Sequence, residues 1–176
     1  MKNLFNLLSY KLSNRTSDGR VKYLRKQGCK IGEKTRLLCS ISCFGTEPYL
    51  IEIGEDCLLS GNLSLFTHDG GVKVLNSLNY FDGKKMDKVG KIIIGNNCFI
   101  GCGAKIMSGV TIGDNVIVGA GSIVTKDCPS NSIVAGVPAK IICTIEEFYE
   151  KNKDKFVNTA GMSHERKKVF LLEYFD

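Results

Sequence analysis

An aliphatic residue stands at every sixth position from Ile94 to Val124, and this spacing limits what the chain can fold into. The six anchors are Ile94, Ile100, Ile106, Ile112, Val118 and Val124. A second small or apolar residue lies two places before each anchor. A period of six matches neither the helical repeat nor the simple alternation of a half-buried strand. It predicts a solenoid of short strands and tight corners, with the anchors pointing inward.

The same spacing extends upstream with two interruptions. Ile31, Leu37 and Cys43 are in phase, Pro48 interrupts, and Ile53, Leu59 and Leu65 restore the repeat. From Asp69 to Lys91 the repeat fails, and it resumes in phase at Ile92. Irregular loops longer than about 12–15 residues are uncommon inside compact domains and are usually functional or disordered. We therefore predict a loop, near 69–91, extruded from an intact coil.

Helices are expected at both ends of the repeat. Leu4, Phe5, Leu7, Leu8 and Leu12 give the first segment an apolar helical face. We favour packing of this face on the coil end or on a partner subunit over contact with a membrane surface. A second helix is expected over Asp18–Gln27, because Gly28 is a typical stop.

The C-terminal segment has two further helical patterns, over Ile145–Phe156 with Thr144 as N-cap and over Ser163–Phe175. The length of 176 residues suits one domain. We expect a single domain over 1–176, with a helical segment at 1–30, the coil at 31–142 and a helical tail at 143–176.

Composition excludes several classes of protein. No apolar run approaches the roughly 18 residues of a membrane span, and no secretory signal is evident, so we expect a cytoplasmic protein without a membrane span. The formal net charge is +6, but no aromatic-rich basic groove accompanies it, and nucleic-acid binding is not expected. The eight cysteines form no Cys-x-x-Cys pair, and Cys57 and Cys98 fall on inward positions. Reduced thiols are therefore favoured over disulfides or a structural zinc site.

Three segments carry a resemblance to a known family: the run Ile94–Val124, the segment Ile112–Asp127 and the exit Ala135–Lys140. Because of these segments, residues 31–142 resemble the hexapeptide-repeat acyltransferases. Within that family they look most like the maltose, galactoside and polysaccharide O-acetyltransferases. The resemblance implies a mainly β fold, a left-handed parallel β-helix of about four coils, although parallel crossovers are right-handed in about 98% of cases. It also implies a homotrimer with active sites between subunits, and acetyl-CoA as co-substrate without a metal.

His68 is the candidate general base, because an attacking hydroxyl must lose its proton and histidine can accept it near neutral pH. The spacing alone favours a partly buried turn histidine that makes one hydrogen bond, whereas the family's catalytic histidine at this loop favours catalysis. This chain reads Thr67-His68-Asp69-Gly70-Gly71 where the sugar acetyltransferases usually have Gly-His-Pro. Asp69 is a candidate for orienting the imidazole or contacting the acceptor, or only a turn residue. Asn62 is a second candidate acceptor contact, or a turn residue.

The family's motifs also place a cofactor channel on this sequence. They imply that Cys102, Ala120, Thr125 and Lys126 line the channel for coenzyme A. Lys140 falls where the family has a basic residue near the nucleotide phosphate. Each of these positions is also compatible with a turn or strand role.

The resemblance predicts an acetyl-CoA-dependent O-acetyltransferase acting on a sugar hydroxyl in cell-surface polysaccharide biosynthesis. An N-acyltransferase acting on an amino sugar and an antibiotic acetyltransferase are close alternatives. A zinc lyase on the same coil needs three histidine ligands, and this chain has two histidines. A non-enzymatic trimeric scaffold is the remaining alternative.

Overall fold

The computed structural model describes residues 2–176, with side chains described from Leu8 onward. The chain divides into two compact units, Met1–Ile145 and Glu146–Asp176. None of the described helices has the length and apolar character needed to cross a bilayer.

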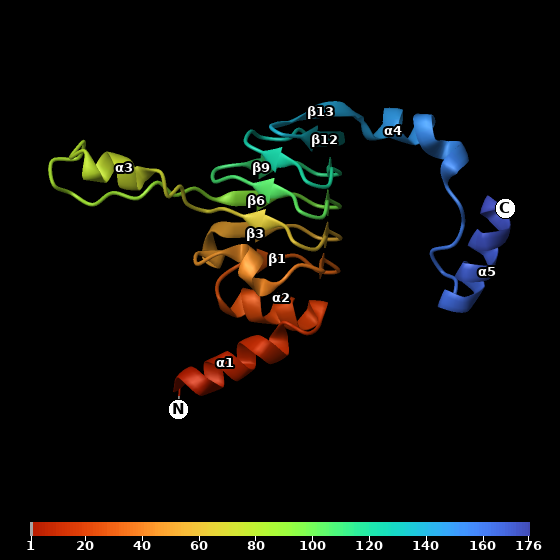
Figure 1. The fold of residues 1–176 in the computed structure, drawn as a ribbon, viewed down its shortest axis with the longest axis horizontal. Coiled ribbons are helices and arrows are strands. Elements are labelled where there is room, and N and C mark those ends of the chain that lie inside the picture. The colour runs from red at the N-terminus through yellow and green to blue at the C-terminus, as the bar shows by residue number, and fades with distance from the viewer. Residues whose placement is uncertain (1) are drawn as a thin grey trace. The chain divides into compact units, whose positions relative to one another are not determined.

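The first unit is a solenoid whose short parallel strands stack into three sheets (Figure 1). The first sheet contains β1 (Lys30–Ile31), β3 (Ile51–Ile53), β6 (Ile92–Ile94) and β9 (Thr111–Ile112). The second contains β2 (Arg36–Leu37), β4 (Leu58–Leu59), β7 (Phe99–Ile100), β10 (Ile117–Val118), β12 (Ser132–Gly136) and β13 (Ala139–Thr144). The third contains β5 (Ser64–Leu65), β8 (Lys105–Ile106) and β11 (Ile123–Val124). Only the last pair, β12 and β13, is antiparallel among these ladders.

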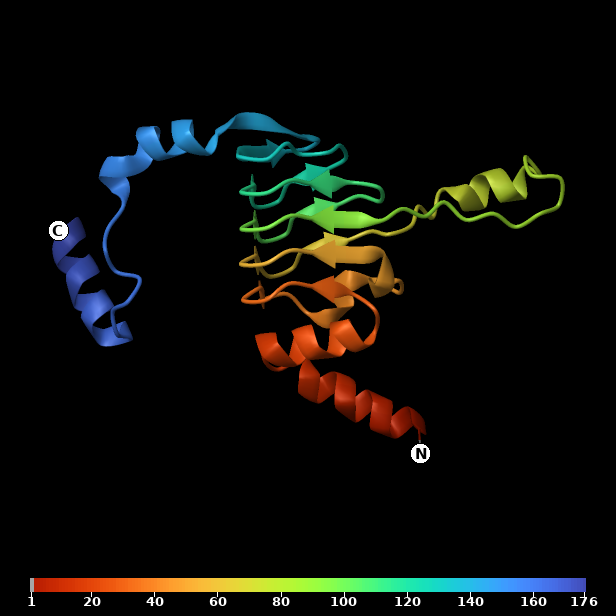
Figure 2. The same ribbon diagram turned by 180° about the vertical axis from the view of Figure 1, so that it is seen from behind.

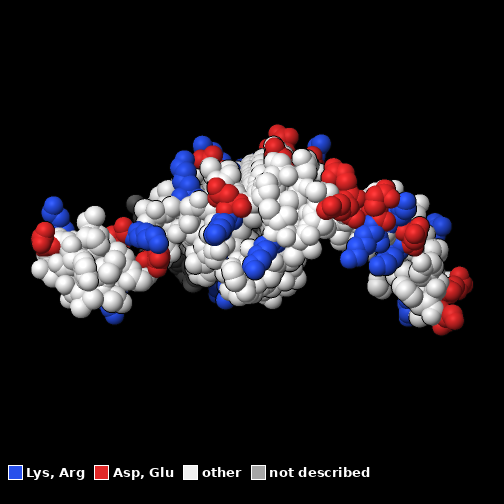
Figure 3. All heavy atoms as spheres, turned by 90° about the horizontal axis from the view of Figure 1, so that it is seen from above, with Lys and Arg blue, Asp and Glu red and all other residues white. Residues whose placement is uncertain are grey.

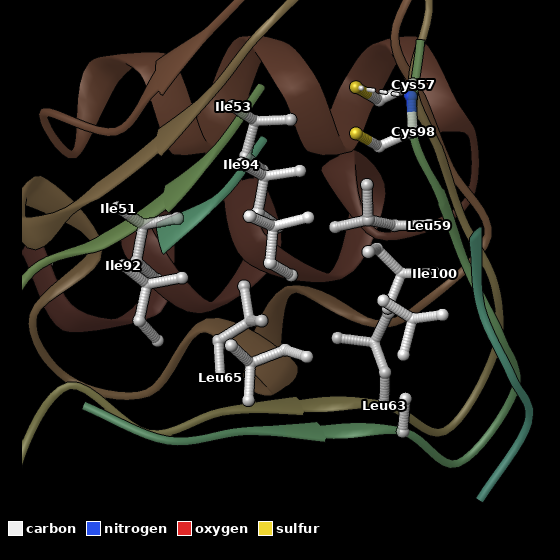
Figure 4. Packing of buried hydrophobic residues seen from close by; sticks show 14 of the residues in the cluster. Ile51, Ile53, Cys57, Leu59, Leu63, Leu65, Ile92, Ile94, Cys98 and Ile100 are labelled. Carbon is white, nitrogen blue, oxygen red and sulfur yellow. Dashed lines mark hydrogen bonds between the residues drawn. The ribbon is translucent and has the colours of Figure 1, made fainter. Parts of the chain in front are cut away.

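The repeat predicts the core correctly. All six anchors from Ile94 to Val124 are at most 1% exposed, and the residues two places before them are also buried. Figure 4 shows how equivalent residues of successive turns, such as Ile53 and Ile94 or Leu59 and Ile100, stack inside the coil. Cys57 and Cys98 occupy such stacked inward positions, as predicted, and the Cys98 N–H donates to Cys57 Sγ at 3.5 Å.

The first turn of the coil departs from the repeat. Cys43, which is in phase by spacing, is only half-buried, and no strand forms there. Instead the 3₁₀ helix η1 (Ile41–Phe44) buries Ile41 and Phe44. Gly45, at φ +66°, ends this helix, and Pro48 begins the next one, η2 (Pro48–Leu50). A proline at the first helical position is favourable because its missing N–H would have no partner there.

Residues 69–91 leave the coil as an arm, as predicted (Figures 1 and 2). The arm contains a short helix, α3 (Val72–Ser77), which the sequence pattern did not indicate. Its base is closed by an antiparallel bridge between His68 and Val89. The coil resumes without a shift, because Ile51 pairs with Ile92 and Ile53 with Ile94. The arm is therefore an insertion that leaves the stacking of the coil intact.

Two helices precede the coil, α1 (Lys2–Ser13) and α2 (Ser17–Lys26). The Thr16 side chain caps α2 by accepting a hydrogen bond from the Gly19 N–H. Arg20 Nη1 donates to Leu37 O at 2.7 Å, and Arg25 Nη2 donates to Ile31 O at 2.7 Å. Helix α2 thus covers the open end of the solenoid and satisfies carbonyls of its first strands, which an exposed edge would leave unpaired.

Helix α1 packs on α2 through Tyr10 and Tyr23, whose ring centroids are 5.8 Å apart in an edge-to-face arrangement. Leu8 and Leu12 are 51% and 60% exposed. These two leucines therefore do not pack on the coil end, and their predicted alternative packing on a partner subunit stays a prediction. The side chains of Leu4, Phe5 and Leu7, which belong to the same predicted face, lie outside the described residues.

The exit after β11 is more regular than the sequence analysis expected, because β12 and β13 form a hairpin instead of a run of turns. The two predicted C-terminal helices form as α4 (Ile145–Asn152), which ends at Asn152 instead of the predicted Phe156, and α5 (His164–Phe175). The 3₁₀ helix η3 (Lys153–Lys155) follows α4, and Tyr149 stacks on Phe156 with centroids 6.3 Å apart. Ser163 caps α5.

Candidate functional site

His68 is paired with a carboxylate at the base of the arm. Its Nδ1 lies 2.9 Å from Glu47 Oε2, and its side chain is 49% exposed. A carboxylate only accepts hydrogen bonds, so this contact places the ring proton on Nδ1 and leaves the lone pair on Nε2. An exposed imidazole held in this tautomer is suited to accept a proton from a bound hydroxyl.

Glu47 is itself fixed by two threonines. Thr46 Oγ1 donates to its Oε1 at 2.6 Å, and Thr67 Oγ1 donates to its Oε2 at 2.7 Å. These hydrogen bonds from Thr46 and Thr67, together with that from His68, lower the pKa of the Glu47 carboxyl to about 2. Glu47 is therefore ionised at neutral pH and its orientation is set before any ligand binds.

Asp69, which the sequence analysis considered as the partner of His68, has other partners. Its Oδ1 accepts the Gly71 N–H at 2.9 Å, and its Oδ2 accepts Lys88 Nζ at 3.1 Å. The bond from Gly71, followed by that from Lys88, lowers the pKa of Asp69. Because the Asp69 N–H also donates to Lys88 O at 2.8 Å, this residue joins the two chain segments at the base of the arm.

A groove of about 560 Å³ opens between the arm and the coil at this point. Thr46, Glu47 and His68 line its coil side, and Asp69 lies where the arm begins. Its arm side is lined by Val72, Lys73, Asn76, Ser77, Lys85, Asp87, Lys88 and Val89. The groove is large enough for a sugar-sized ligand, and the His68–Glu47 pair lies within its wall.

Thr125 and Lys126 lie on the same corner of the coil as His68. The register joins Leu65 to Ile106 and Ile106 to Val124, so the residues that follow β5, β8 and β11 stack on one another. Thr125 and Lys126 are both exposed. No ion pair of Lys126 occurs within the described part of the chain.

Cys102 and Ala120 lie on the preceding corner, where Gly121 N–H donates to Cys102 O at 2.8 Å. Both residues are exposed. The corners approach closely, since a Cβ on Gly101 would lie 2.5 Å from Ala120 N. Lys140 is near this corner, because it pairs with Ala135 on β12, the strand next to β10.

Asn62 belongs to this second corner and not to the corner of His68. It is exposed and has φ +56°, matching the left-handed conformation of Gly103 and Gly121 at the equivalent positions of the next two turns. Asparagine is one of the few side-chain-bearing residues that adopts this conformation readily. The geometry gives Asn62 a turn role, and its proposed contact with an acceptor stays a prediction.

Sequence reasoning missed Glu47. The indication available was the interruption of the repeat at Pro48, since residues that break a regular coil are free to point at a neighbouring loop. No spacing argument relates Glu47 to His68, which lies 21 positions away, because Glu47 lies between η1 and η2, outside the repeat of six.

The cysteines and potential metal ligands are dispersed. All eight cysteines are free, and Cys102 is the exposed one. No group of three or more His, Cys, Asp and Glu side chains within residues covered by the structure is arranged to hold a metal ion. Burial raises the pKa of the Cys29 thiol to about 12, which makes it unreactive.

Comparison with known proteins identifies the family. Residues 91–126 match the model described as bacterial transferase hexapeptide (six repeats). Protein CapG of Staphylococcus aureus is 42% identical over 153 residues, which cover 86% of this chain and 87% of that protein. The chain belongs to the hexapeptide-repeat acyltransferases.

Two further similarities relate this hexapeptide-repeat acyltransferase to named activities. A solved structure of galactoside acetyltransferase in complex with coenzyme A is 26% identical, with a TM-score of 0.61, covering 90% of this chain and 85% of that one. Galactoside O-acetyltransferase of Escherichia coli strain K12 is 39% identical over 103 residues. That match covers 57% of this chain and about half (47%) of the relative.

Proposed function

We propose that this acyltransferase transfers an acetyl group from acetyl-CoA to a sugar hydroxyl, with His68 as general base. The observation that carries the proposal is the His68–Glu47 pair in the wall of the 560 Å³ groove. We further propose that the reaction occurs in the cytoplasm and serves the synthesis of a cell-surface polysaccharide. The similarity to galactoside O-acetyltransferase supports a sugar as the acceptor.

In the proposed reaction the acceptor lies in the groove with its hydroxyl against His68 Nε2. The hydroxyl oxygen attacks the thioester carbonyl, the carbon–sulfur bond breaks, and coenzyme A leaves as the thiol. His68 takes the hydroxyl proton during attack and returns it to the leaving sulfur, so it ends the cycle neutral. Glu47 holds Nδ1 and stabilises the imidazolium formed in between. Asp69 orients the arm that forms the other side of the groove.

Coenzyme A would lie along the glycine corners. Cys102, Ala120 and Thr125 are exposed, and Cys102 and Ala120 lie beside glycines that allow a ligand to approach closely. Backbone N–H groups there can stabilise the negative charge that develops on the carbonyl. Lys126 and Lys140 are exposed cations that suit the phosphates of the cofactor. These residues and acetyl-CoA therefore fit chemically.

The two corners flank the third sheet, with His68 on one side and Cys102 on the other. We propose that the corner of Cys102 in one subunit faces the arm and His68 of a neighbouring subunit in a homotrimer. The coil would then be left-handed with about four turns, and residues 1–176 would act as one acyltransferase domain.

Release of free coenzyme A thiol, measured with a panel of simple sugars and acetyl-CoA, tests the proposal. His68→Ala should lower kcat by about 10²–10⁴-fold, as expected for loss of a general base. His164→Ala, which changes an exposed histidine of α5, is the matched control and should leave turnover unchanged. Near-normal turnover of His68→Ala would refute the proposed role of His68 as general base. Amino sugars in the same panel distinguish O-acetylation from N-acetylation.

A further inference from the structure

Positive charge is concentrated at the N-terminal end of this molecule. Residues 1–36 contain ten of the 24 lysines and arginines but only two of the 18 acidic residues. The other 140 residues carry slightly more acidic than basic side chains, so this N-terminal basic segment accounts for the entire net charge of +6. It forms α1, α2, β1 and β2. The opposite end of the coil, viewed in Figure 3, shows basic and acidic side chains interspersed.

Helix α1 adds an exposed apolar face to this segment. Leu8 and Leu12 are one helical turn apart and 51% and 60% exposed. Tyr10, which packs edge-to-face on Tyr23, lies on the opposite side of the helix, so the leucines point away from α2. Lys11 is exposed beside them. One face of α1 therefore presents leucines together with a cation.

Helix α2 contributes further cations. Lys22 and Lys26 are exposed and four residues apart, on the side of the helix away from the buried Val21 and Leu24. Within the described residues, neither lysine makes an ion pair. A groove of about 520 Å³ between α2 and the first turn of the coil is lined by Lys22, Arg25, Lys34 and Arg36, with Asp18 and Glu33 as its acidic side chains.

We propose that the N-terminal basic segment docks on the surface of an anionic lipid bilayer. Leu8 and Leu12 would enter the boundary between headgroups and acyl chains, and Lys11, Lys22 and Lys26 would contact lipid phosphates. Helices that bind in the plane of a membrane combine apolar and basic residues in this way. Each Lys or Arg near an anionic surface strengthens partitioning about fivefold.

Other occupants fit these observations less well. A soluble polyanion matches the charge but gives no reason for two leucines that point into solvent. A second copy of this end would cover the leucines, but it would bring two strongly basic segments together at the cost of mutual repulsion. An anionic bilayer satisfies both the charge and the apolar face.

Co-sedimentation of the full chain with vesicles tests this docking. The vesicles contain equal parts of phosphatidylglycerol and phosphatidylcholine, and vesicles of phosphatidylcholine alone are the reference. We expect binding to the anionic vesicles at about 0.1 M salt and its loss at about 1 M salt, because screening shortens the electrostatic range. Leu8→Glu/Leu12→Glu should weaken binding by about tenfold or more. Lys11→Gln/Lys22→Gln/Lys26→Gln should weaken it by about a hundredfold.

Matched controls come from α5, where Leu172 is 58% exposed and Lys167 and Lys168 are exposed. Leu172→Glu and Lys167→Gln/Lys168→Gln should bind as the natural chain does. Absence of binding, or equal losses in the α5 variants, would overturn the proposal. Loss with the lysine variant alone would indicate a site for soluble anions, and a smaller assembly for the leucine variant in sedimentation velocity would indicate an interface between copies. Either result overturns membrane docking. Acetyl transfer to a soluble sugar, measured on the same samples, is independent of all these outcomes.

Discussion

The imidazole Nδ1 of His68 lies 2.9 Å from Glu47 Oε2, which joins the base of the arm to the irregular first turn of the coil. Because Thr46 and Thr67 hold the same carboxylate, the imidazole has a fixed partner in the absence of ligand. A general base arranged in this way, as we propose for His68, needs no reorientation when the acceptor arrives.

Glu47→Ala should lower kcat by about 10–100-fold, because the change removes the group that orients His68. The KM for acetyl-CoA should stay within about twofold, because the residues proposed to bind coenzyme A are unchanged. Initial-rate kinetics with acetyl-CoA varied at saturating acceptor measure both constants. Glu52→Gln is the matched control. Glu52, on β3, forms ion pairs with Lys30 and Lys91 and has no contact with His68 among the described interactions. Equal effects of the two changes would contradict a positioning role for Glu47.

Glu47 should also make the free energy of unfolding depend on pH. Its carboxyl pKa of about 2 lies below the ordinary value of 4.5, so the unfolded chain takes up the proton first as pH falls. The stabilisation is therefore complete above about pH 4.5 and is lost as pH falls towards about 2. Urea unfolding of the natural chain and Glu47→Gln at several pH values should show a difference that is constant above pH 5 and shrinks below it. A difference that grows with acid would contradict the assignment.

The core could be predicted from the sequence because a strict repeat of six fixes which residues point inward. Ile106 and Ile112, for example, are fully buried where the spacing places them. The first turn of the coil could not be predicted from the sequence, because η1 buries Ile41 and Phe44 out of phase with the repeat. The hairpin of β12 and β13 was also missed, since its antiparallel pairing follows no period of six.

The candidate site was only partly predictable for the same reason. His68 is next to a regular strand, so its place at the mouth of the arm follows from the spacing. Its partner Glu47 comes from an irregular segment, whose direction depends on how η1 and η2 pack. Asp69 is adjacent to His68 in sequence, yet its backbone and carboxylate hold Lys88 and Gly71 instead. Adjacency along the chain was a poor guide where the chain turns sharply.

Cys102 should be the thiol that reacts first with a maleimide, because it is the exposed cysteine among eight free ones. If coenzyme A lies on the corner of Cys102, saturating desulfo-coenzyme A should slow the labelling of Cys102 by maleimide about tenfold, since the bound ligand covers the thiol. Mass spectrometry of tryptic peptides measures the labelling. Cys102→Ser removes the fast phase and serves as the control. Unchanged labelling in the presence of the ligand would place the cofactor elsewhere.

Asn115 links three successive turns at the corner between the first and second sheets. Its Oδ1 accepts from Asn97 Nδ2 at 2.8 Å, its Nδ2 donates to Asn131 Oδ1 at 2.8 Å, and its φ is +56°. Asn115→Ala should lower the free energy of unfolding by about 2–3 kcal/mol, from two lost hydrogen bonds and a side chain in the left-handed region.

Asn115→Gly separates the two causes, because it removes the same hydrogen bonds but tolerates a positive φ. We expect glycine to lower the free energy of unfolding by about 1 kcal/mol less than alanine does, measured by urea unfolding at neutral pH. If alanine and glycine cost the same, the left-handed backbone contributes nothing and the amide ladder alone holds this corner. If neither change has an effect, the ladder is a consequence of the stacked turns and does not stabilise them.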